Sequence, residues 1–171
     1  MEHRTPGNRN SKEGAYIIMN PKTLKPPATY AEWAEVLDKL RKKEDDPSVI
    51  EAMHKGTLVW QSGVAERFSQ KLIDTINARM NSAVDKFQKD MQRSNGHEEA
   101  IIQALLSLRK EFGFLYQAIN LPVIPEKDMS RYCSLVREQA DKAQSSLEDS
   151  AKKDRTGKLA SIVRNHKVNN F

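Results

Sequence analysis

Histidine clusters and paired carboxylates carry much of the metal and acid–base chemistry of proteins, and this chain shows no such pattern. No HExxH motif occurs among its four histidines. His97 precedes Glu98 and Glu99, a trio that could hold a cation weakly but is more typical of a solvated turn leading into a helix. The sequence therefore predicts no metal site and no cofactor.

Nucleophile and phosphate-loop motifs are also missing from the sequence. The single cysteine, Cys133, falls in an apolar helical pattern and is expected to pack as a small hydrophobe. One cysteine also excludes an internal disulfide and a zinc knuckle. Gly157-Lys158 lacks the spacing of a phosphate loop, and no GxSxG or GxGxxG occurs. We therefore expect a protein that is not an enzyme and takes no small-molecule substrate.

The composition indicates a charged, helix-rich chain. Of its 171 residues, 38% are hydrophobic and 30% are charged, and Gly and Pro number only 7 each. This length suggests one domain with tails. The composition excludes a collagen-like chain, and no apolar run approaches the roughly 20 residues that a membrane helix needs. We expect no membrane association and a cytoplasmic location.

Charge is distributed unevenly along the sequence. Residues 1–28 carry a net charge of +3 and residues 152–171 a net charge of +5, whereas residues 29–151 carry −3. Basic ends on an acidic body are either solvated tails or contacts for a phosphate-rich partner such as nucleic acid. The expected contacts at the C-terminal end are Lys152, Lys153, Arg155, Lys158, Arg164 and Lys167.

Two short helices are predicted before residue 60. Thr29 and Glu32 have the spacing of a capping box, in which each side chain bonds the backbone N–H of the other. Trp33 and the leucines that follow it then repeat at helical spacing. Asp46 is expected to cap a second helix, with Pro47 in its first turn and a stop at Gly56.

Three long helices follow in the apolar pattern. They are expected at residues 63–93, at 98–120, and from 126 towards a stop at Gly157. The helix at 98–120 carries two adjacent apolar stripes, so it belongs at the centre. Short turns between long helices favour antiparallel neighbours.

The predicted fold class is all-α: an elongated antiparallel helical bundle of three long helices with a shorter N-terminal helical cover. Residues 29–157 form the bundle. Residues 1–28 form an extended, partly disordered basic arm, and residues 158–171 form a basic C-terminal tail.

Five apolar side chains are candidates for protein contacts. Tyr16, Ile17 and Ile18 form an apolar island in the arm that packs either on its own body or on a partner. Trp33 lies in the first predicted helix. Phe114 lies off both stripes of its helix, so it is either covered by the arm or exposed.

The leading functional hypothesis is a non-catalytic helical binding protein whose basic ends contact nucleic acid or a nucleoprotein assembly. The alternative is a protein–protein adaptor or assembly subunit that self-associates or docks a partner helix and has no nucleic-acid role.

Overall fold

The computed structural model describes residues 24–171, and within this range 74% of the residues are helical and no strand occurs. The all-α prediction is confirmed. The six helices of the described range are α1 (Tyr30–Lys42), α2 (Asp46–Lys55), α3 (Val64–Arg93), α4 (Glu98–Ile119), α5 (Glu126–Lys152) and α6 (Lys158–Asn165).

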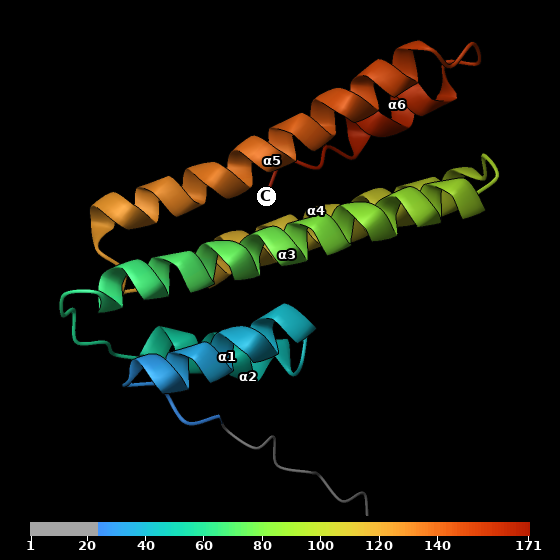
Figure 1. Ribbon diagram of the computed structural model, residues 1–171. Coiled ribbons are helices and arrows are strands. Elements are labelled where there is room, and N and C mark those ends of the chain that lie inside the picture. Colours follow the sequence, from blue (N-terminus) through green and yellow to red (C-terminus); the bar gives the residue numbers. More distant parts are fainter. Residues whose placement is uncertain (1–23) are drawn as a thin grey trace, which may run out of the picture.

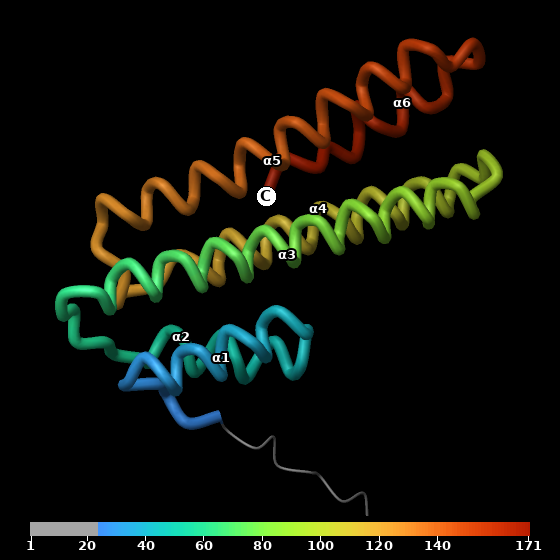
Figure 2. Tube along the Cα trace, viewed as in Figure 1, coloured from blue at the N-terminus to red at the C-terminus, as the bar shows by residue number. Residues whose placement is uncertain are grey.

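The helices form three antiparallel hairpins stacked in layers (Figure 1). The α3–α4 hairpin is the middle layer, with α1 and α2 on one side and α5 and α6 on the other, as the tube in Figure 2 also shows. At about 1.5 Å per residue, α3 is roughly 45 Å long and sets the length of the molecule. The predicted central helix, α4, therefore shares the middle layer with α3.

The predicted capping box is present at the start of α1. The Thr29 hydroxyl accepts a bond from the Glu32 N–H, and the Glu32 carboxylate accepts one from the Thr29 N–H. A bond from the Lys25 ammonium, together with the N–H groups of Ala28 and Thr29, lowers the pKa of Glu32 to about 2. The chain leading into α1 is thus tied to its first turn.

Trp33 anchors the α1–α2 layer on α3. Its side chain is fully buried, its indole N–H donates to the Thr57 carbonyl at 2.8 Å, and its ring meets Phe68 edge to face at 5.2 Å. Gly56 lies so close that a Cβ there would sit 2.5 Å from the Trp33 ring. The prediction that Trp33 contacts a partner is therefore wrong, because its ring has no free surface.

Arg79, on α3, joins all the helices of the first two layers. Its guanidinium is 1% exposed and lies between Asp46, at 2.8 Å, and Glu111, at 2.6 Å. It also donates to the Leu40 carbonyl at the end of α1 and stacks over the Phe114 ring at 4.5 Å. A buried cation is tolerated only when it is paired and hydrogen-bonded in this way.

This network corrects two expectations. The N-cap of α2 is Asp45 rather than Asp46, because the Asp46 carboxylate bonds the Arg79 guanidinium instead of its own helix. Phe114 is half-buried, with the Arg79 guanidinium over its ring, so it is not left exposed; the alternative that the arm covers it depends on residues outside the described range.

The segment 158–171, which we expected to be a tail, packs on the bundle. It begins with α6, whose Ile162 and Val163 are 6% and 1% exposed. Beyond α6, Val168 is fully buried and its N–H donates to the buried Gln144 side chain at 2.9 Å. The apolar residues of this segment share one face, which covers α5 and α4.

Replacing the buried guanidinium tests the network directly. Arg79→Met leaves Asp46 and Glu111 facing each other without their shared cation, so the free energy of unfolding should fall by about 3–5 kcal/mol. Urea denaturation followed by circular dichroism measures this. Arg67→Met, at an exposed position of α3, should change it by less than about 0.5 kcal/mol. If Arg79→Met lowers the free energy of unfolding by less than about 1 kcal/mol, the network does not stabilise the fold as described.

A second substitution tests whether α6 belongs to the bundle. Val163→Asp places an unpaired charge at a buried position, and we expect a loss of about 3 kcal/mol or more in unfolding free energy. Thermal denaturation of Ser161→Asp, at an exposed position of the same helix, is the matched control. Equal melting temperatures for the two variants would mean that α6 does not pack as described.

Candidate functional site

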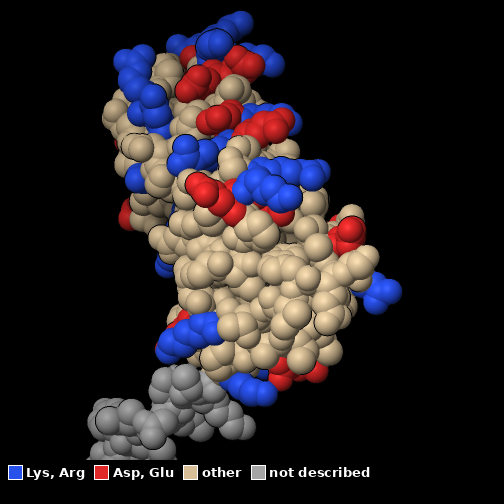
Figure 3. All heavy atoms as spheres, turned by 90° about the vertical axis from the view of Figure 1, so that its left-hand side faces the viewer, with Lys and Arg blue, Asp and Glu red and all other residues tan. Residues whose placement is uncertain are grey.

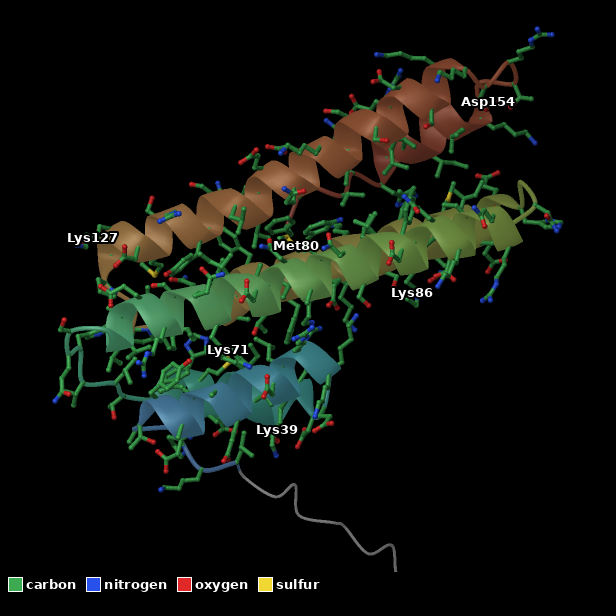
Figure 4. The ribbon with its side chains drawn as sticks, viewed as in Figure 1. Lys39, Lys71, Met80, Lys86, Lys127 and Asp154 are labelled. Atoms are coloured by element: carbon green, nitrogen blue, oxygen red, sulfur yellow. The ribbon has the colours of Figure 1, made fainter. Side chains whose placement is uncertain are left out.

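The turn between α5 and α6 is organised by hydrogen bonds to one carboxylate. The Asp154 carboxylate accepts bonds from the N–H groups of Leu159 and Thr156 and from the Thr156 hydroxyl, and these bonds lower its pKa. Gly157 supplies a positive φ of 69° where the chain reverses. Asp154 is labelled at this turn in Figure 4. The side chains on either side of Asp154 are thereby held on a fixed backbone.

The six predicted cations all lie on this one hairpin, and all are exposed. Lys152 bonds Asp149 at 2.8 Å. Among the described residues, the other five make no ion pair within 4 Å; they are Lys153, Arg155, Lys158, Arg164 and Lys167. We call these five residues the basic hairpin. About 9 Å of α6 separates Lys158 from Arg164, so the charges extend along the helix.

A hollow of about 740 Å³ separates the α5–α6 turn from the α3–α4 turn. We call it the turn hollow. Its apolar lining comes from Met91, Ile101, Leu159 and Ile162. Its polar lining comes from Ser94, Gly96, His97, Glu98, Asp154, Thr156 and Lys158. A groove of about 520 Å³ between α3 and α5 shares Met91 and Leu159 with it.

The opposite end of the molecule has a different surface. Residues 56–65 and 112–125 contain no charged side chain, and their loops meet where the Trp60 indole N–H donates to the Val123 carbonyl at 3.2 Å. Val59 is 70% exposed and Trp60 is 37% exposed. Figure 3, which views this side, shows a broad area of uncharged side chains below a charged upper part. We call loops 56–63 and 120–125 the uncharged end.

Sequence reasoning found the cations but neither the turn hollow nor the uncharged end. The absence of charged residues at 56–65 and 112–125 could have predicted the uncharged end from the sequence. The turn hollow had no such signal, because its two walls are about 60 residues apart in the sequence. Tyr16, Ile17 and Ile18 lie outside the described residues.

Side chains that could act as nucleophiles or metal ligands are dispersed in the described range. Cys133 is partly buried, and this burial raises the pKa of its thiol, which disfavours the reactive thiolate. Within residues 24–171, no three histidine, cysteine or acidic side chains gather as a set of metal ligands.

In the same range, no helix has both the length and the apolar character to cross a membrane. A scan against protein-family models, a search of curated proteins and a search of solved structures each found no match to this chain.

Proposed function

We propose that this protein is a non-catalytic binding protein that contacts nucleic acid, alone or in a nucleoprotein assembly, through the basic hairpin. The observation that carries the proposal is that five exposed cations without ion-pair partners share one structured element. Elsewhere in the described range, lysines such as Lys55, Lys86 and Lys142 lie within 4 Å of carboxylates on their own helices, and the other cations without an ion pair are spread over α1, α3, α4 and α5. Cations without such partners are the ones available to phosphates.

The chemistry of the basic hairpin suits contacts with the phosphate backbone of a nucleic acid. Lysine and arginine neutralise phosphates without reading sequence, so binding should be only weakly sequence-specific. Five phosphate contacts would give a slope of about −4 to −5 in a plot of log affinity against log salt concentration on duplex DNA. The acidic body of the protein would repel phosphate and so confine the contact to this end.

Neutralising the basic hairpin tests this function. Deleting residues 152–171 would be uninformative, because Ile162, Val163 and Val168 are buried in the bundle. The five-site variant instead carries Lys153→Gln, Arg155→Gln, Lys158→Gln, Arg164→Gln and Lys167→Gln. Fluorescence anisotropy with labelled nucleic acid should show an affinity loss of at least about tenfold at low salt, and the salt dependence should flatten.

A control variant with the same net charge separates a local contact from general attraction. Its five substituted positions are exposed and lie outside the basic hairpin: Arg41→Gln, Lys42→Gln, Arg67→Gln, Lys127→Gln and Arg131→Gln. Lys127, for example, lies at the other end of α5 (Figure 4). Equal losses in the two variants, or no binding by the unmodified protein at low salt, would contradict the proposal.

A second candidate function is favoured by the uncharged end. Exposed tryptophan and valine in a surface without charge are typical of protein–protein contacts, whose buried centres are depleted of charged residues. On this reading the protein is an adaptor or assembly subunit, and two copies meeting through this end would avoid like-charge repulsion.

Self-association through the uncharged end has a direct test. Sedimentation of the unmodified protein at rising concentration should show association that changes little with salt, since an apolar contact depends weakly on ionic strength. Val59→Asp should abolish the association, and Gln103→Asp, at an exposed position of α4, should not. A strict monomer at high concentration, or association unaffected by Val59→Asp, would refute self-assembly through this end.

A further inference from the structure

We propose that the turn hollow receives an unpaired nucleobase, so that the ligand of the basic hairpin is single-stranded nucleic acid. This inference rests on the proposed function and deepens it. The two features are contiguous, because Lys158 belongs both to the basic hairpin and to the lining of the hollow. A strand whose phosphates lie on the hairpin would therefore have the hollow within reach of its bases.

The size and lining of the hollow fit this ligand. Its volume, about 740 Å³, lies in the range of roughly 300–1,000 Å³ that is usual for small-ligand pockets. Met91 and Leu159 are half-buried and present apolar surface to it, while Ile101 and Ile162 lie deeper. A nucleobase has apolar faces and a polar edge, so it can use both the apolar and the polar parts of this lining.

The charges around the hollow differ from one wall to the other. Glu98 lies on the α4 wall, whereas the opposite wall carries Lys158 together with Asp154, whose carboxylate is bonded by the N–H groups of Thr156 and Leu159. A phosphate is attracted to Lys158 and repelled by Glu98. A carboxylate can instead accept a hydrogen bond from the exocyclic amine of a base. This asymmetry orients a nucleotide with its phosphate towards the hairpin and its base towards α4.

Duplex nucleic acid cannot fill the hollow without disruption. Its bases are stacked and paired, and extruding one costs a few kcal/mol. The bases of a single strand are already free to leave the stack and enter a protein pocket. The hairpin alone would bind both forms through phosphates, whereas the hollow adds affinity only for the single strand.

The experiment compares a labelled 12-nucleotide single strand with the corresponding 12-base-pair duplex at one salt concentration. The unmodified protein should bind the single strand about tenfold more tightly, which corresponds to about 1.4 kcal/mol from one bound base. Met91→Ser removes apolar surface from the hollow without changing charge, so it should reduce this preference several-fold while leaving duplex affinity unchanged. Leu106→Ser, at an exposed position outside the hollow, should keep the preference. Thermal denaturation checks that both variants fold.

The outcomes separate this inference from the proposed function. Equal affinity of the unmodified protein for the two forms, or a preference that is unchanged in Met91→Ser, would overturn the base-binding hollow and leave the basic hairpin as a phosphate contact. Failure of both forms to bind at low salt would overturn the proposed function, and the inference with it.

Discussion

The buried guanidinium of Arg79 is the interaction on which the arrangement of the first two layers depends. A cation that is 1% exposed is stable only with its acceptors in place, and these come from three separate parts of the chain: Asp46, Glu111 and the Leu40 carbonyl. Sliding α1 and α2 along α3 would take Asp46 and the Leu40 carbonyl away from this charge and leave it with Glu111 alone. Apolar packing holds the layers together, and this network sets their relative position.

Fixed layers give the molecule two chemically different ends. The loops before α3 and α5 lie at one end and form the uncharged end, where Trp60 bonds across to Val123. The turns after α3 and α5 lie at the other, roughly 45 Å away by the length of α3. If both candidate surfaces bind, the protein could hold a protein partner at one end and nucleic acid at the other.

Local sequence signals predicted the elements well because their physical causes are local. The capping box at Thr29 and the positive φ of Gly63 mark helix starts through interactions close by in the chain. The helix that we expected to stop at Gly157 ends instead at Lys152, and Gly157 caps the start of α6. Arg79 was missed because its partners lie more than 30 residues away on either side. The segment 158–171 was mistaken for a tail because its three Lys and Arg residues are balanced by no acidic residue, whereas Ile162, Val163 and Val168 are buried against the bundle.

We propose that nucleic acid binds at the end of the molecule that carries the basic hairpin. The most direct measurement is a titration of single-stranded nucleic acid into isotope-labelled protein, followed by the backbone amide signals in NMR spectra. If this proposal is right, shifts cluster at residues 152–167 and at 91–98, around the two turns. Shifts that cluster instead at residues 56–63 and 120–125, or an absence of shifts at low salt, would contradict it.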